Sequence, residues 1–168
     1  MKKAANNYAF IDGQNLHLGI QSIGWKLDYK KFRVYLREKY GVGIAYMFMG
    51  YLAANQPLYT FLQSVGYILM FKPIMYSKDG DIKGNVDADL VLQVMLDYPS
   101  YDKALIITSD GDFYSLVRHL HKEKKLAVVM SPYVKTCSEL LKQSAKEKIV
   151  FMDNLRKKLE YLKRKSTA

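Results

Sequence analysis

Four aspartates at the ends of regular elements are the residues of this sequence best suited to chemistry. Asp110 and Asp112 come directly after an apolar run that is typical of a buried strand. Asp12 ends a similar run, and Asp87 begins a helical pattern. Carboxylates that meet at one place repel each other and need a cation, and a set of oxygen ligands favours Mg²⁺ or Mn²⁺ over zinc. The pattern therefore predicts a metal site built from aspartates.

Such a site suits the hydrolysis of phosphodiester bonds, because a divalent cation polarises a phosphate oxygen while a carboxylate orients or deprotonates water. Asn15 follows Asp12 by three residues, about one helical turn, so its amide can bind a phosphate oxygen or hold the Asp12 carboxylate. Taken singly, each acid also has a structural interpretation. Asp112 suits a helix N-cap, and Asp87 and Asp89 suit the first turn of a helix. Only the convergence of the acids would make a site.

Alternating strands and helices must position these residues. The strands are expected at 8–12, 44–52, 67–72, 104–108, 126–130 and 149–152, and the helices at 16–23, 29–40, 57–65, 86–97, 112–122, 138–145 and 154–165. This order predicts a three-layer α/β/α sandwich with a mostly parallel, Rossmann-like sheet. The strands that carry Asp12 and Asp110 should then be neighbours at the switch point of the sheet, where ligands bind. The polar segment 73–85, with a turn signal at 78–81, leads to the helix of Asp87.

Length and composition indicate a single domain over residues 1–168, with its core at about 8–150. Cys137 is the only cysteine, which excludes an intrachain disulfide and a cysteine-based zinc site. No apolar stretch is long enough for a membrane span, and the N-terminus has no signal-peptide pattern, so a cytoplasmic protein without membrane contact is expected. The net charge is +10, and residues 142–168 carry nine Lys or Arg against three Asp or Glu. That basic segment is expected either to attract a polyanion or to be only a solvated helical face.

Three sequence blocks, taken in order, resemble the signature of the NYN domain, in the LabA-like branch of the PIN-like nuclease superfamily. The blocks are Asp12-Gly-Gln-Asn15, Lys83-Gly-Asn-Val-Asp87-Ala-Asp-Leu90 and Thr108-Ser-Asp110-Gly-Asp112-Phe113. The resemblance covers about residues 8–150 and implies a PIN-like sandwich with Mg²⁺- or Mn²⁺-dependent ribonuclease activity. It implies that the catalytic, metal-binding acids are Asp12, Asp87, Asp110 and Asp112, and that the residues at the substrate are Asn15, Lys83 and Ser109. Asp89 matches the family pattern less well, and the sequence leaves open whether Asp89 and Asp97 take part.

Other classes fit the sequence less well. A haloacid-dehalogenase-type phosphatase needs a second acid where Gln14 stands, and no Walker-type phosphate loop occurs. The strongest alternative is a non-catalytic RNA-binding adaptor that retains a metal-binding acidic pocket. For either function the expected partner is single-stranded RNA. The sequence leaves open the RNA target, endo- or exonucleolytic action, the number of metal ions, the oligomeric state (a homodimer is one option) and the pathway.

Overall fold

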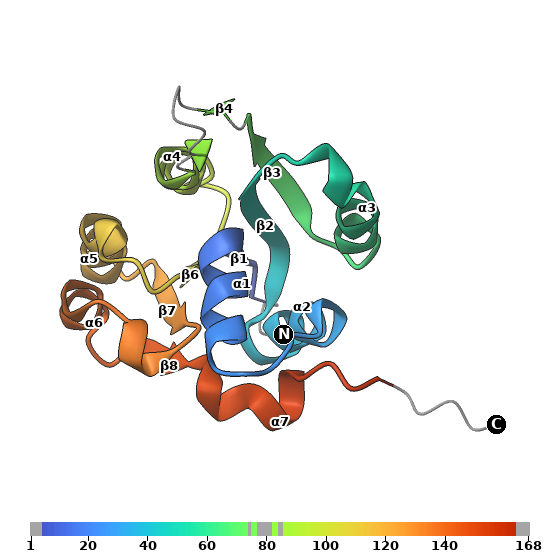
Figure 1. The fold of residues 1–168 in the computed structure, drawn as a ribbon. Helices are drawn as coiled ribbons and strands as arrows, with labels where there is room; N and C mark the ends of the chain where they lie inside the picture. The colour runs from blue at the N-terminus through green and yellow to red at the C-terminus, as the bar shows by residue number, and fades with distance from the viewer. Residues whose placement is uncertain (1–4, 74, 77–81, 84–85, 164–168) are drawn as a thin grey trace.

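A six-stranded parallel sheet forms the centre of the molecule. The computed structural model describes residues 5–73, 75–76, 82–83 and 86–163 (Figure 1). The sheet has the strand order β3-β2-β1-β6-β7-β8, and all neighbouring strands are parallel. These strands are β1 (Asn7–Asp12), β2 (Val42–Gly50), β3 (Ile68–Lys72), β6 (Ala104–Ile107), β7 (Leu126–Ser131) and β8 (Ile149–Phe151).

Helices connect the strands and cover both faces of the sheet. The α-helices are α1 (Gly13–Ser22), α2 (Tyr29–Tyr40), α3 (Gln56–Ser64), α4 (Asp87–Leu96), α5 (Tyr114–Lys122), α6 (Glu139–Ala145) and α7 (Arg156–Leu159). Short 3₁₀ turns are η1 (Ala53–Asn55), η2 (Gly111–Phe113), η3 (Val134–Thr136) and η4 (Met152–Leu155). No helix in the described part of the chain is both long enough and apolar enough to cross a membrane.

The alternation of side chains along each strand produces two separate cores. In β1, Ala9 and Ile11 face one core, whereas Tyr8 and Phe10 face the other, as expected for a strand buried on both faces. The first core contains residues of α1, α2, α3 and α7, and the second contains residues of α4, α5 and α6. Figure 1 shows α4, α5 and α6 in a row along one side of the sheet. The predicted α/β/α sandwich with a parallel sheet is therefore confirmed.

Local signals in the sequence explain the boundaries of α2. The Asp28 carboxylate accepts a hydrogen bond from the Lys31 amide at 3.0 Å and caps the N-terminus of the helix. Gly41 ends the helix in the left-handed conformation, with a φ of 64°, which a glycine adopts without steric cost. These two caps place α2 at Tyr29–Tyr40, the range expected from the sequence.

The C-terminal helix is the main error in the expected elements. It was expected at 154–165, but α7 ends at Leu159 and Glu160 is extended. The Asp28 amide donates to the Leu159 carbonyl and the Tyr161 amide donates to the Lys26 carbonyl, both at 2.8 Å. This pairing with the segment before α2 replaces helical hydrogen bonds. Leu159 is buried, but Leu162 is 68% exposed, so these two leucines do not share one buried face.

The segment between β3 and α4 contains two short strands. β4 (Met75–Tyr76) and β5 (Ile82–Lys83) pair antiparallel. The expected turn at 78–81 lies outside the described residues. Lys83 therefore belongs to the second strand of a short ladder that immediately precedes the helix of Asp87.

Candidate metal centre

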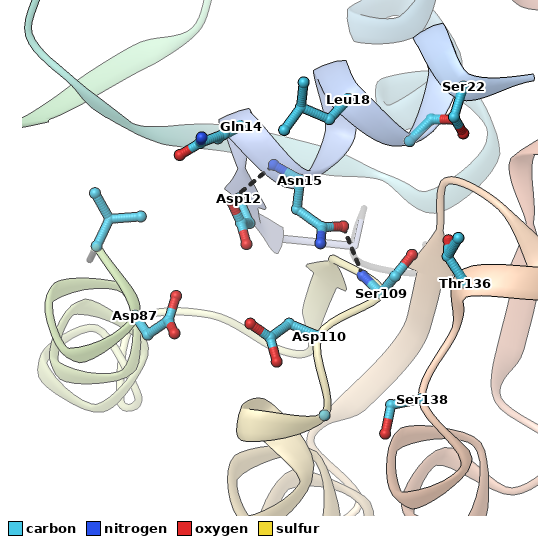
Figure 2. A pocket seen from close by; sticks show the side chains of 13 residues that line it. Asp12, Gln14, Asn15, Leu18, Ser22, Asp87, Ser109, Asp110, Thr136 and Ser138 are labelled. Carbon is cyan, nitrogen blue, oxygen red and sulfur yellow. Dashed lines mark hydrogen bonds between the residues drawn. The ribbon is translucent and has the colours of Figure 1, made fainter. Parts of the chain in front are cut away.

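The candidate site lies at the switch point of the sheet. β1 and β6 are adjacent parallel strands, with Ile11 paired to Ile107, so the residues after them meet at one edge. From β1 the chain crosses to β2 on one side, and from β6 it crosses to β7 on the other. Because the connections after the two strands run in opposite directions, a crevice is left at the carboxyl ends of these strands. A cleft of about 770 Å³ opens there, and Asp12, Asp87 and Asp110 line it (Figure 2).

Asp12 is fixed on the floor of this cleft. It ends β1 and caps α1, where its Oδ1 accepts a hydrogen bond from the Asn15 amide at 3.1 Å. Its Oδ2 accepts a hydrogen bond from the Thr108 hydroxyl at 3.3 Å. The residue is only 6% exposed. Gly13 permits this position because a Cβ there would lie 2.9 Å from the Phe48 carbonyl oxygen, so a larger residue would push α1 away from β2.

Asp110 is held by a network that includes the same threonine. The Asp110 amide donates to Thr108 Oγ1 at 3.1 Å, and the Asp110 carboxylate accepts from the Asp112 amide at 2.9 Å. Thr108 is fully buried and thus links the ends of β1 and β6. Gly111 lets this turn approach α6, because a Cβ there would collide with Ser138 Oγ. We did not expect this role for Thr108 from the sequence. A hydroxyl residue at the end of a buried strand could have indicated a hydrogen bond to the neighbouring acids.

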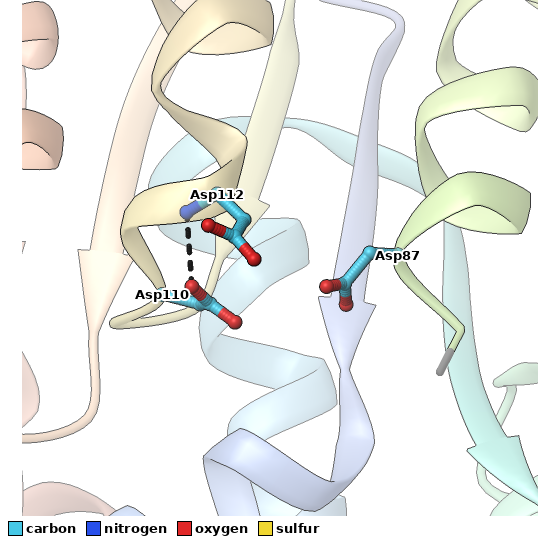
Figure 3. Close-up of side chains that lie close together, drawn as sticks. All are labelled: Asp87, Asp110 and Asp112. Atoms are coloured by element: carbon cyan, nitrogen blue, oxygen red, sulfur yellow. Dashed lines mark hydrogen bonds between the residues drawn. The ribbon is translucent and has the colours of Figure 1, made fainter. Parts of the chain in front are cut away.

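Three carboxylates approach one another closely. Asp87, Asp110 and Asp112 each offer one oxygen, and these oxygens lie within 4.8 Å of one another (Figure 3). Asp87 comes from the first turn of α4, whereas Asp110 and Asp112 come from the turn after β6. Asp87 and Asp110 are half-buried, and Asp112 is exposed. Asp12 lies in the same cleft but is not part of this closest group of the described residues.

The electrostatics of the cleft fit a cation. Burial is the main cause that raises the pKa of Asp12 from 3.8 to about 6, and the nearby charges of Asp87 and Asp110 raise it further. The hydrogen bonds from the Asn15 amide and the Thr108 hydroxyl act in the opposite direction but do not cancel these effects. At neutral pH the cleft therefore holds a buried, ionised carboxylate beside other acids. A set of carboxylate oxygens of this kind suits Mg²⁺ or Mn²⁺.

Asn15 and Ser109 connect the two sides of the cleft. Asn15 Oδ1 accepts a hydrogen bond from the Ser109 amide at 2.8 Å, and the Asn15 side chain reaches from α1 across to the end of β6 (Figure 2). Ser109 Oγ forms a hydrogen bond with Ser131 Oγ at 2.8 Å, so its hydroxyl points to a structural partner. Asn15 therefore supports the geometry of the site and also borders the cleft. The Lys83 side chain lies outside the described residues, so its expected contact stays a prediction.

The two acids whose roles the sequence left open lie outside this group. Asp89 forms an ion pair with Lys72 at 3.7 Å, and Asp97 accepts a hydrogen bond from Gln93 at 2.9 Å. Neither of them lines the main cleft in the described part of the chain. Asp89 therefore lies on the side of α4 that faces β3. Asp97 lies at the C-terminal end of α4.

The far half of the cleft is uncharged. It runs along α1 past Leu18 and Ser22, and Thr136 and Ser138 form the facing wall. Gly19 allows the facing loop to approach, because a Cβ there would lie 2.5 Å from a side-chain carbon of Pro132. No pattern in the sequence indicated this half, since its hydroxyl groups come from segments more than 100 residues apart. The cleft thus joins an acidic end to a neutral, hydroxyl-lined end.

Comparisons with known proteins agree with the fold and the motifs. The NYN domain family model matches residues 8–153. The low amplitude and bright protein LabA of Synechococcus elongatus is 25% identical over 166 residues, which cover 92% of this chain and 88% of that protein. This chain is also similar to the crystal structure of a protein of unknown function from Vibrio parahaemolyticus, with a TM-score of 0.78 and 21% sequence identity. The match covers 96% of this chain and 99% of the Vibrio chain. The structural likeness supports the fold, and the family match confirms the resemblance carried by the three motifs.

Proposed function

Because this chain belongs to the NYN domain family, we propose that it is a Mg²⁺- or Mn²⁺-dependent ribonuclease that hydrolyses phosphodiester bonds of single-stranded RNA. The family belongs to the PIN-like nuclease superfamily, which supports a hydrolase that acts on nucleic acid. One observation carries the proposal for this chain. Acids from separate segments converge at the switch point of the sheet, and three of them lie within 4.8 Å of one another.

The carboxylates would hold the cation. Asp87, Asp110 and Asp112 offer the closest set of oxygens, and Asp12 completes the set from the floor of the cleft. When bound, the cation would polarise the scissile phosphate and lower the pKa of water. The hydrogen bonds from Thr108 and Asn15 fix the Asp12 carboxylate before substrate arrives, and such preorganisation favours catalysis.

The surroundings of the acids suit the remainder of an RNA chain. Asn15 is placed to donate from its amide to a phosphate oxygen, while its Oδ1 stays bonded to the Ser109 amide. Ser22, Thr136 and Ser138 can form hydrogen bonds with ribose hydroxyls in the neutral half of the cleft. The net charge of +10 favours association with a polyanion from a distance.

A cleavage assay with a matched pair of variants tests the proposal. We expect the purified protein to cut a labelled single-stranded RNA with Mg²⁺ or Mn²⁺ and to lose this activity in EDTA. Asp110→Asn should lower the cleavage rate by at least about 100-fold. Replacing a residue that only supports a metal ligand costs up to about 100-fold in activity, and replacing the ligand itself should cost more. Asp102→Asn is the control, because Asp102 is exposed and lies at the opposite edge of the sheet, before β6.

The same assay separates the nuclease from the adaptor. An adaptor would bind the RNA and leave it intact with every divalent cation. Wild-type-like cleavage by Asp110→Asn would instead show that the acids are not the catalytic centre. Circular dichroism of both variants controls for folding, and Asn at position 110 keeps the acceptor for the Asp112 amide.

A further inference from the structure

A second depression, the edge groove, lies between β3 and α4. It has a volume of about 360 Å³, and its walls include Phe48, Met70, Phe71, Lys72, Val86 and Leu92. The groove exists because β3 is the edge strand of the sheet, while α4 packs toward β1 with Leu90 and Val94 in the core. Among the residues that the structure describes, the α4 side of β3 is thus incompletely covered, and Ile68 on this strand is 45% exposed.

The edge groove continues the cleft of the metal centre. Val86 lines both depressions. The next residue, Asp87, belongs to the acidic group, and Asp89 one half-turn later borders the groove. An extended chain that is bound at the acids can therefore reach the groove over the N-terminus of α4, where Val86 borders both depressions.

The chemistry of the groove differs from that of the cleft. Leu92 is 56% exposed and presents apolar surface to the groove, with Met70 and Val86 on its other walls. The charged residues on its walls are Lys72 and Asp89, which pair with each other at 3.7 Å. The groove as a whole is therefore close to neutral. Exposed apolar surface beside a polar site is typical of a ligand-binding groove.

We propose that the edge groove holds an unpaired nucleobase of the RNA strand whose phosphate lies at the metal centre. This inference rests on the proposed ribonuclease function and adds a base-binding subsite to it. A nucleobase is flat, uncharged and largely apolar on its faces, which matches walls formed by Met70, Val86 and Leu92. A base inside a duplex cannot turn out of its stack without breaking its pair, so the groove favours single-stranded substrate.

An abasic scan combined with a surface truncation tests the subsite. A set of short labelled RNAs, each with one abasic ribose at a different position, is measured for binding with Ca²⁺, which supplies a divalent cation for the carboxylates, and for cleavage with Mg²⁺. For the wild type, we expect one position at a fixed distance from the cut to weaken binding about tenfold when its base is missing. Leu92→Ala should weaken binding of the intact RNA to a similar extent and should make that abasic site neutral. Leu92 is exposed, so its truncation should leave the fold intact.

Leu140→Ala is the matched control, because Leu140 is 53% exposed on α6 and lines neither depression in the described part of the chain. It should leave the abasic profile unchanged. A flat abasic profile, or a Leu92→Ala profile identical to the wild type, overturns the subsite whether or not the RNA is cut. Absence of cleavage with a position-dependent abasic profile overturns the nuclease but keeps the subsite. A wild-type dimer that Leu92→Ala converts to a monomer, with RNA binding unchanged, would show that a second copy covers the groove and would also overturn it.

Discussion

Replacing Asp12 with asparagine should stabilise the protein when divalent cations are absent. Asp12 is buried, and its pKa is raised from 3.8 to about 6, chiefly by burial and then by the charges of Asp87 and Asp110. A difference of about two pH units between the folded and unfolded states corresponds to about 3 kcal/mol, at 1.36 kcal/mol per unit. The ionised carboxylate destabilises the folded state by up to this amount, and asparagine removes the charge.

The pH dependence separates this electrostatic effect from any change in packing. Below about pH 4 the carboxyl is protonated in both states and contributes no difference. Between about pH 4 and 6 the unfolded state has lost the proton and the folded state still binds it, so the stability of the wild type falls as the pH rises. Above about pH 6 the destabilisation is complete and constant. The advantage of Asp12→Asn should therefore grow from near zero to about 3 kcal/mol across this window.

Urea denaturation in EDTA at a series of pH values measures this difference directly. Asp102→Asn serves as the control, since it changes an exposed carboxylate far from the cleft. An advantage of Asp12→Asn that is the same at pH 4 and pH 7 would refute the electrostatic argument, and so would a loss of stability that grows with pH. Addition of Mg²⁺ should then reverse the order, because a cation that binds the folded state stabilises the wild type more than the variant.

Two further predictions concern backbone packing and the basic C-terminal segment. Gly13→Ala should destabilise the fold by about 1–3 kcal/mol in denaturant melts, because the new methyl group would meet the Phe48 carbonyl at 2.9 Å. Gly43→Ala, where the nearest atom is a side-chain oxygen at 3.3 Å, should have a smaller effect, and equal losses would argue against the close approach. Replacing the basic residues at 163–165 with glutamine should lower the salt slope of RNA binding by about 2 and leave cleavage at saturating RNA unchanged. An unaltered slope would mean that this segment is only a solvated surface.

The sequence was sufficient to predict the layers of the fold and the edge that carries the site. Apolar runs with turn residues between them located the strands of the main sheet to within two residues, because a parallel sheet buried on both faces demands such runs. The position of Asp12 and Asp110 on neighbouring strands also followed, since a doubly wound sheet has one switch point between its halves.

The details that position the acids depend on contacts between distant segments. The Thr108 hydroxyl reaches Asp12 across 96 residues of sequence, and the Ser109 hydroxyl forms a hydrogen bond with Ser131. The end of α7 could not be predicted from the local sequence either. The spacing of the leucines favours a longer helix, whereas backbone hydrogen bonds with residues 26–28 end the helix at Leu159. Tertiary hydrogen bonds override propensity in each case.

The distribution of charge makes a cation-dependent interaction with RNA the expected behaviour of this protein. The net charge of +10 attracts a polyanion at long range, yet the floor of the cleft presents clustered carboxylates that repel a phosphate at contact. Without a cation, RNA should therefore bind to the basic surface and avoid the acidic end of the cleft. A divalent cation reverses the sign of the local field and lets one phosphate reach the acids. This coupling distinguishes a metal-binding cleft from a static acidic pocket, because only the former draws RNA into the cleft when metal is added, and cleavage of that RNA then separates the nuclease from the adaptor.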